Sequence, residues 1–361
     1  MGFFDFSAAF ACAIRCGNTG VMVTVGDRLY RDLCAALVPG TGLEEIGAEL
    51  SRVIAPVVAH DALRCGAMNP ASGLSTTTLA FWHGYAPDLG RALLSADGMG
   101  ADLGELARVA RQSVPVVVAD GGLRSGTGDR PLAKYGVGEE LRLALRDARG
   151  VWGVLCLLRA AGGRPFDDGD AQRIVGIGSS LITALRRYVT AGPVAPPPLE
   201  PPPGMLVLDA DGRVSAVTAP ARRWLDAMAA QQAVPEWLTE SSFAALAAVA
   251  REHPKYLRLC VPSVGSGWWT AIEAQPLGDD GDVAVVIQRA TGTLLLPSFC
   301  DWYGVTTRER QIMQHLHNGS APKQIARTFG LSVHTINDHL KAIFRKTGAN
   351  GRDELMAAIN A

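Results

Sequence analysis

The sequence of 361 residues lacks an apolar run long enough to cross a membrane. Its longest apolar runs, such as residues 151–158, fall far short of the roughly 20 residues that a membrane-spanning helix needs. The N-terminus also lacks the basic region and apolar stretch of a signal peptide. We therefore expect a cytoplasmic protein with no membrane partner.

Cysteine pairs at metal-ligand spacing are missing as well. The seven cysteines are an odd number, and no two CxxC motifs occur among them. This pattern argues against a disulfide framework and favours reduced thiols. We expect no bound metal.

Motifs that hold catalytic groups are also absent. The chain has no Gly-x-Ser-x-Gly, no phosphate-binding GxxxxGK and no His-Glu-x-x-His. His60 and His83 stand alone, and isolated histidines are more often ordinary polar contacts than metal ligands. We therefore expect no enzyme activity and no cofactor.

Charge is scarce and unevenly distributed. Charged residues make up 19% of the chain and the net charge is −1. Residues 298–361 hold eight Lys and Arg against five Asp and Glu, so this tail carries +3 and residues 1–297 carry −4. Only the tail has the sign that phosphate groups attract.

Proline marks the first division of the chain. Residues 193–203 contain seven prolines, which are incompatible with a helix or a central strand and predict a stiff, extended linker. A softer boundary lies near residues 290–298, where a strand-like run ends before Pro297. We predict a first domain at 1–192, a linker at 193–203, a second domain at 204–297 and a third at 298–361.

Helical and strand-like patterns alternate in the first domain. The predicted helices cover residues 43–58, 101–111 and 168–188, and the predicted strands cover 63–68, 76–82, 114–119, 139–146 and 151–158. The last helix carries an apolar stripe that includes Ile174, Leu181 and Tyr188. We expect this stripe to be core, with dimer packing as the alternative.

This order of elements resembles the GAF domain, over residues 43–188. The resemblance implies a small-molecule sensory fold with a central antiparallel sheet, helices on its faces and a pocket beneath a loop. Residues 121–128, rich in glycine, suit either that loop or a plain surface loop. The candidate pocket residues are Trp82, His83, Tyr85 and Arg142. The sequence identifies neither the ligand nor which residues bind it.

The second domain contains two predicted hairpins with a short helix after the first. The hairpins pair residues 205–209 with 213–217 and residues 268–273 with 283–288. This arrangement resembles a reduced PAS domain over residues 204–290. No cofactor-anchoring residue stands out, so we expect a spacer or a dimerisation module.

The tail opens with two short helices. Thr306 and Glu309 have the spacing of a capping box, which begins a helix that ends near Gly319. Pro322 suits the first position of the next helix, and Gly330 suits its end. Ser332 then caps a longer helix over residues 333–346.

The longer helix has an apolar face and a polar face. Ile336, Leu340 and Ile343 are expected to point inward. The opposite face carries His334, Asn337, Asp338, Lys341 and Arg345. Asparagine can contact an adenine edge, aspartate can accept from cytosine, and lysine can contact guanine or phosphate. Two short helices joined by a tight turn, the second one polar outward, are the geometry that enters the major groove.

The tail closely resembles the LuxR-type, or GerE-type, helix-turn-helix. The matching residues are Thr306, Arg308, Glu309, Gly319, Lys323, Ile325, Ala326, Leu331, Ser332, Thr335, Ile336, His339, Leu340, Ile343, Lys346, Gly348, Arg352 and Leu355. The resemblance implies an all-helical domain of four helices, a recognition helix at residues 333–346 and a final helix that dimerises. Asn337 stands where many members carry lysine, and Asp338 puts a negative charge on the same face, so base preference cannot be transferred.

The predicted sites follow from this resemblance. The candidate DNA-binding residues are Lys323, His334, Thr335, Asn337, Asp338, Lys341, Arg345 and Lys346, with Asn337 and Lys341 directed to bases and Lys323, Thr335 and Lys346 to phosphate. The candidate dimerisation residues of the final helix are Leu355, Met356 and Ile359. A solvated helix face is the alternative for any single lysine or arginine among them.

The leading hypothesis is a bacterial one-component transcription regulator. It binds double-stranded promoter DNA as a homodimer at the nucleoid. Its signal is a small-molecule effector of unknown identity. The GAF-like domain is the expected sensor, and the PAS-like domain is a second candidate sensor. The fold class is therefore α+β multidomain, with two antiparallel sheets and an all-helical C-terminal domain.

Two alternatives stay open. The sensor could be a redox switch built on Cys12, Cys16, Cys34 or Cys65, although most cysteines outside an electropositive site are simply buried apolar residues. More remotely, the chain could be an enzyme with a DNA-binding tail.

Overall fold

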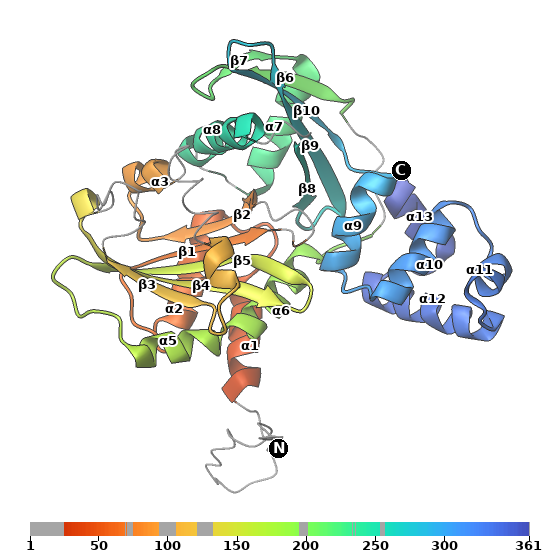
Figure 1. The fold of residues 1–361 in the computed structure, drawn as a ribbon, viewed down its shortest axis with the longest axis horizontal. Coiled ribbons are helices and arrows are strands. Elements are labelled where there is room, and N and C mark those ends of the chain that lie inside the picture. Colours follow the sequence, from red (N-terminus) through yellow and green to blue (C-terminus); the bar gives the residue numbers. More distant parts are fainter. Residues whose placement is uncertain are drawn as a thin grey trace, which may run out of the picture.

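Two antiparallel α+β domains and an all-helical domain follow one another along the chain (Figure 1). This computed structural model describes residues 25–68, 70, 75–93, 106–120, 133–194, 201–232, 234, 236–252 and 257–360. The arrangement confirms the predicted fold class. Among the residues described, no helix combines the length and the apolar character that crossing a membrane requires.

The first sheet domain is built on five antiparallel strands in the order β2-β1-β5-β4-β3. The strands are β1 (Ala62–Met68), β2 (Ser75–His83), β3 (Val116–Asp120), β4 (Val137–Asp147) and β5 (Gly150–Ala160). The helices are α1 (Val25–Ala36), α2 (Leu43–Ile54), α3 (Pro87–Leu93), the 3-10 turn η1 (Ala133–Tyr135), α5 (Asp168–Val175) and α6 (Gly178–Val189). Each predicted strand of this domain is present, within a few residues of its expected ends.

Helices α1, α2 and α6 lie together on one face of this sheet. Phe81 of β2 meets Tyr188 of α6 edge to face, with ring centroids 5.8 Å apart. Helix α2 packs closely against β2 at Gly47. A Cβ atom at this position would lie 2.1 Å from the carbonyl oxygen of Trp82. Only glycine therefore fits at this crossing. Tyr188 is 2% exposed, so the predicted apolar stripe is core on this helix.

Two predicted helices of this domain differ from the structure. The helix expected over residues 168–188 is divided into α5 and α6 at Gly176 and Ile177. Helix α2 ends at Ile54, because Pro56 follows two residues later and cannot continue the hydrogen-bond ladder. The glycine-rich segment 121–128, Cys12, Cys16 and linker residues 195–200 lie outside the described residues.

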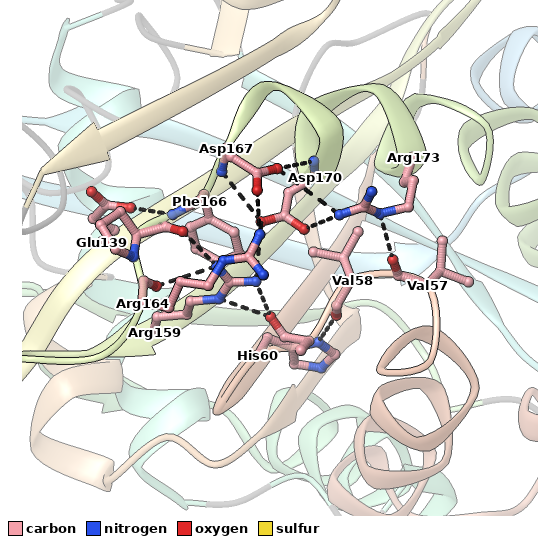
Figure 2. A network of polar contacts seen from close by, with 12 residues as sticks. Val57, Val58, His60, Glu139, Arg159, Arg164, Phe166, Asp167, Asp170 and Arg173 are labelled. Atoms are coloured by element: carbon pink, nitrogen blue, oxygen red, sulfur yellow. Dashed lines mark hydrogen bonds and ion pairs between the residues drawn. The ribbon is translucent and has the colours of Figure 1, made fainter.

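A polar network at the start of α5 connects separate segments of the first sheet domain (Figure 2). Asp170 is 2% exposed, and its carboxylate accepts a hydrogen bond from the Arg173 guanidinium at 2.5 Å. The Arg159 guanidinium lies 3.2 Å from the same carboxylate. Burial alone would raise the pKa of Asp170, but the hydrogen bonds from Arg173 and the Asp167 N–H lower it overall. Arg159 also donates to the carbonyl of Ala59, so the network joins α5, β5 and the segment after α2.

The second sheet domain has the strand order β7-β6-β10-β9-β8. Its strands are β6 (Gly204–Leu208), β7 (Val214–Val217), β8 (Leu257–Ser263), β9 (Trp268–Leu277) and β10 (Asp282–Arg289). Both predicted hairpins are present. The prediction of only a short helix between them was wrong: α7 (Ala219–Gln232) has 14 residues, α8 (Glu236–Glu252) has 17, and β8 was not foreseen.

Helix α9 (Gly292–Trp302) connects the second sheet to the C-terminal helices α10 (Thr307–His317), α11 (Pro322–Phe329), α12 (Val333–Thr347) and α13 (Arg352–Asn360). The domain boundary expected after Pro297 falls inside this helix. Helix α9 packs against β8 and β9 on one side and against α10 and α13 on the other (Figure 1). The C-terminal helical domain is therefore attached through a packed helix.

A set of contacts, which we name the α9 joint, also fastens this region to the first sheet domain. Trp152 of β5 meets Trp302 of α9 edge to face at 5.1 Å. Arg186 of α6 donates to the Trp302 carbonyl at 3.2 Å. Arg149, in the turn between β4 and β5, donates to the Val305 carbonyl at 3.0 Å. The first sheet domain thus contacts the chain immediately before α10.

Candidate nucleic-acid interface

Glu309 fixes the start of α10 and also joins it to α12. Its carboxylate accepts from the Thr306 N–H at 2.7 Å, while the Thr306 hydroxyl accepts from the Glu309 N–H at 3.3 Å. The same carboxylate accepts from Lys346 Nζ at 2.5 Å. Burial alone would raise the pKa of Glu309, but hydrogen bonds from Lys346 and Thr306 lower it overall. The predicted capping box is therefore also a bridge between helices.

Lys346 is placed differently from the other predicted DNA contacts. Its side chain is 25% exposed and paired with Glu309, whose side chain is 6% exposed. Moving the ammonium group to a phosphate would break this ion pair and leave a buried carboxylate without its cation. The structure thus gives Lys346 a role inside the domain.

The turn between α11 and α12 follows the local chemistry of its residues. Pro322 occupies the start of α11, and Gly330 ends this helix with a left-handed φ of 63°. The Ser332 hydroxyl accepts from the Thr335 N–H at 3.0 Å and caps α12. Ile336 and Ile343 of α12 are fully buried, so the predicted inward face is confirmed.

The opposite face of α12 is exposed and polar. His334, Asn337, Asp338, Lys341 and Arg345 are all exposed, and their spacing puts them along one side of the helix. Asp338 lies 3.5 Å from His334 Nε2 and 3.5 Å from Lys341 Nζ. We name this set the α12 polar face. The negative charge that departs from the family pattern thus lies between an imidazole and an ammonium group.

The two remaining predicted contacts lie near the starts of helices. Lys323 is exposed in the first turn of α11. Thr335 is half-buried in the first turn of α12, and its hydroxyl lies 2.9 Å from the Ser332 hydroxyl. The first turn of α12 therefore offers backbone N–H groups and hydroxyls together, which suits a phosphate group.

The predicted dimerisation residues of α13 lie mostly in the core of the C-terminal helical domain. Leu355 and Ile359 are fully buried within the monomer, where α13 packs against α9 and α10. Met356 is half-buried. Leu355 and Ile359 are core residues because α13 is short and one face must cover the other helices. Before α13, the backbone N–H and the side-chain amide of Asn350 both donate to the Glu354 carboxylate.

Sequence reasoning missed the residues that hold the start of this domain. Arg310 of α10 bonds Asp301 of α9, and Arg149 and Arg186 reach the same region from the first sheet domain. Partners more than a hundred positions away leave no local pattern. The only available hint was the charged pair Asp301 and Arg310, nine positions apart.

The first sheet domain brings together three of the four candidate pocket residues. Trp82 and Tyr85 meet edge to face at 5.0 Å. Arg142 and Tyr85 are close enough that the guanidinium lowers the tyrosine pKa, against a larger rise from burial. His83 is exposed and lies apart from this group.

The redox alternative gains no support from the described cysteines. Cys65 is fully buried, and burial raises its pKa to about 12. A thiol with that pKa stays protonated at neutral pH, whereas reactive cysteines form thiolates. Cys34 is half-buried. Within the part of the chain that is described, no three His, Cys, Asp or Glu side chains are grouped to hold a metal ion.

Comparison with known proteins supports the C-terminal domain. Residues 304–358 match the family described as bacterial regulatory proteins, luxR family. No curated protein sequence matches the chain. The C-terminal helices thus form a LuxR-type helix-turn-helix domain, as predicted, of the kind found in bacterial DNA-binding transcription regulators.

Similar solved structures include two VqmA complexes and a bacteriophytochrome. The phage VqmA–DPO complex is 19% identical with a TM-score of 0.22, covering 44% of this chain and 80% of that one. The Vibrio cholera VqmA–ligand–DNA complex is 17% identical with a TM-score of 0.23, covering 44% and 84%. The bacteriophytochrome RpBphP3 of R. palustris is 12% identical with a TM-score of 0.24, covering 73% and 62%. Likeness at this level indicates nothing about what this chain binds.

Proposed function

We propose that this chain is a one-component transcription regulator that binds specific double-stranded promoter DNA through the α12 polar face. The observation that carries the proposal is the two-sided construction of α12. Ile336 and Ile343 are held in the core, while five polar side chains are exposed in a row on the other side. A helix held in this way can enter the major groove without unfolding any part of the domain.

The side chains of the α12 polar face have distinct roles in this proposal. Asn337 contacts an adenine edge, and Lys341 contacts guanine in the same half-site. Asp338 accepts from a cytosine amino group, which explains why a carboxylate on this face is compatible with DNA. The Lys341 ammonium group, 3.5 Å away, reduces the repulsion between Asp338 and the phosphates.

Phosphate groups are contacted around this face. Lys323 and Thr335 lie in the first turns of α11 and α12, and Arg345 lies in the last turn of α12. Such contacts fix the orientation of the helix and carry no sequence information. Lys346 is left out of this set because of its ion pair with Glu309.

The protein binds DNA as a homodimer in this proposal. Dimeric helix-turn-helix proteins contact two half-sites about one helical turn apart, and their operators mirror the two-fold symmetry. Leu355 and Ile359 are core residues, so of the three predicted dimerisation residues only the half-buried Met356 is left partly exposed for a partner. Sedimentation of the free protein and of its DNA complex measures the number of copies.

The first sheet domain controls the C-terminal helical domain through the α9 joint in this proposal. Arg186 donates to the carbonyl of the last residue of α9, Arg149 donates to the Val305 carbonyl between α9 and α10, and Trp152 packs on Trp302. A small-molecule effector that changes the first sheet domain therefore changes the support of the DNA-binding helices. The chain acts without enzymatic turnover.

Selection of genomic fragments by the purified full-length protein tests this function. A double variant, Asn337→Ala with Lys341→Ala, is the control, because both positions are exposed and their loss leaves the core intact. We expect the wild type alone to enrich a two-fold symmetric site. Equal enrichment of the same site by wild type and control would contradict a role for the α12 polar face, and failure of the full-length wild type to enrich any fragment would contradict DNA binding.

A further inference from the structure

Four side chains form a row across the first sheet, on the face opposite α1, α2 and α6. The strand register pairs Trp82 with Arg64, Arg64 with Cys156, and Cys156 with Arg142. Paired residues of adjacent strands point to the same face. The row therefore crosses β2, β1, β5 and β4 in sequence. We name Trp82, Arg64, Cys156 and Arg142 the polar row.

The polar row lies in the interior although two of its members are charged. Arg64 is 5% exposed and Arg142 is 3% exposed. Glu140, which is fully buried, accepts from Arg142 at 2.7 Å and lies 3.9 Å from Arg64 Nη2. Arg64 also donates to Cys156 Sγ at 3.3 Å. Ionised groups inside a protein are costly to desolvate and cluster at functional sites.

Tyr85 lies among these groups. Its ring packs on Trp82, and its pKa depends on all the charged neighbours. Burial raises the pKa of Tyr85 well above its ordinary value, Glu140 and Cys156 raise it further, and Arg64 and Arg142 lower it. Trp82 is in turn 5.6 Å from the Arg64 guanidinium. The two aromatic rings and the ionised side chains thus belong to one cluster.

Two neutral donors of this cluster have no hydrogen-bond partner. The Trp82 Nε1 and Tyr85 Oη atoms are both buried and unsatisfied. Buried donors in native proteins are nearly always satisfied, so each exception calls for an acceptor such as a ligand or a water molecule. Two such donors beside ionised groups indicate a place for an acceptor-rich molecule.

Tyr188 shows that an unsatisfied tyrosine alone is not a site. Its hydroxyl is also buried without a partner, on the opposite face of the same sheet. However, burial is the single cause that raises the pKa of Tyr188, to about 12, and no charged group acts on it. Tyr188 therefore provides a matched control for Tyr85.

We propose that the polar row, with Tyr85 and Glu140, binds a small organic carboxylate. The carboxylate oxygens accept from the Trp82 N–H and the Tyr85 hydroxyl, beside the guanidinium groups of Arg64 and Arg142. The organic part packs on the two aromatic rings. This inference rests on the proposed function and names the class of its effector.

The position of Trp82 links such a ligand to the second sheet domain. The indole of Trp82 also meets Trp237 of α8 edge to face at 5.4 Å. Helix α3 lies so close to Trp237 that a Cβ atom at Gly90 would be 2.4 Å from its ring. A ligand that orders Trp82 therefore acts at a tight contact between the two sheet domains.

Calorimetry and thermal unfolding of the full-length protein test the assignment. The probes are acetate and benzoate, each beside its uncharged amide, and inorganic phosphate, all at millimolar concentration. We expect at least one carboxylate to bind and to raise the melting temperature, with its amide bound at least ~10-fold more weakly, because a hydrogen bond to a charged group is the stronger kind. No DNA is present, so failure here is separate from failure of DNA binding.

Two conservative variants locate the binding. Trp82→Phe and Tyr85→Phe keep an aromatic ring and remove one donor each, and each should weaken carboxylate binding by roughly 10-fold or more. Tyr188→Phe should leave the affinity unchanged. The assignment is overturned if neither carboxylate binds, if phosphate binds and the carboxylates do not, or if Tyr188→Phe weakens binding as much as Tyr85→Phe.

Discussion

The first sheet domain and the C-terminal helical domain use their charged side chains in opposite ways. In the first, Arg64, Glu140 and Arg142 are buried in the middle of a sheet. In the second, Asp338 and Lys341 form a similar acid–base pair on the outside of a helix. Water screens the outer pair and leaves it available to a large, charged partner, whereas the inner cluster excludes everything except a small molecule.

This difference also affects stability. An exposed ion pair contributes at most ~1 kcal/mol, because both charges are solvated with or without each other. A buried pair that loses one partner leaves a desolvated charge behind, which is far more costly. Charged residues therefore serve recognition in the C-terminal helical domain. In the first sheet domain, the loss of one of them destabilises the fold.

The largest expected effect is a loss of stability from Glu140→Gln. The glutamine amide can still accept a hydrogen bond from Arg142 but carries no charge, so the ion pairs with Arg142 at 2.7 Å and with Arg64 at 3.9 Å are lost and the free energy of unfolding should fall by ~3–5 kcal/mol. Urea denaturation measures it. Asp338→Asn is the matched exposed change and should cost less than ~0.5 kcal/mol. Equal losses in the two variants would remove the contrast between the domains.

Glu309→Gln should come next, because Glu309 is the buried acid of the helical domain. We expect a loss of about 1.5–3 kcal/mol at neutral pH, the value of hydrogen bonds to a charged group. The folded pKa of Glu309 is lowered, so its contribution is present above the unfolded pKa of about 4.3 and is lost as the pH falls through the folded pKa. Urea denaturation at several pH values should show wild type and variant converging in acid. A difference that persists in acid would contradict this, and exposed Glu45→Gln is the control.

Lys341→Ala should weaken binding to the selected DNA site by ~1–3 kcal/mol and relax the preference at one base pair. Fluorescence anisotropy with the selected site and with single-base variants of that site measures both effects. If Lys341 contacts only phosphate, the loss is uniform across sequences and the salt slope falls by ~1. That outcome would leave sequence recognition to Asn337 and Asp338.

Arg149→Ala should loosen the α9 joint. The variant loses the hydrogen bonds from Arg149 to the carbonyls of Cys300 and Val305. Together these bonds should contribute about 1 kcal/mol to the free energy of unfolding. We expect the helical domain and the first sheet domain to unfold in separate steps, visible by calorimetry, where the wild type unfolds in one. Arg213→Ala, an exposed change with a single ion pair in the second sheet domain, is the control. Unchanged cooperativity would mean that the joint does not couple the domains.

Lys323→Ala should have the smallest effect. An exposed phosphate contact contributes equally to every DNA sequence, so the salt slope should fall by ~1 and the ratio between specific and non-specific affinity should stay constant. Anisotropy titrations over a range of salt concentrations measure the slope. A change in that ratio would assign Lys323 to base contact instead.

The same contrast explains what could be predicted from the sequence. The helical domain has caps, stop signals and periodicity that act over a few residues, as at Thr306, Gly330 and Ser332. Every strand of the two sheets except β8 was found for a similar reason, since their alternation and turns are local. Helix α8 was missed because its apolar residues, with Ala244, Ala245, Ala247 and Ala248 among them, show no clear stripe.

Trp82, Tyr85 and Arg142 were candidate pocket residues, but the burial of Arg142 with Glu140 could not be predicted because the sequence of β4 fits two different strand environments. Glu140, Arg142 and Ala144 alternate with Leu141, Leu143 and Leu145, which is the pattern of a strand with one face in water. The structure buries both faces of β4 over these residues. Only the cross-strand register, which places Trp82, Arg64 and Cys156 in one row with Arg142, distinguishes a solvated face from an interior site. Register depends on long-range pairing that one sequence does not reveal.

Methylation protection of guanine N7 tests the central claim most directly, because N7 lies in the major groove. The selected DNA site is treated with dimethyl sulfate, free and bound to wild type or to Lys341→Ala. We predict that the wild type protects guanine N7 in both half-sites and that Lys341→Ala restores the reaction at one symmetric pair of guanines while the complex still forms. Full reactivity of every guanine N7 in the wild-type complex would show that α12 does not enter the major groove.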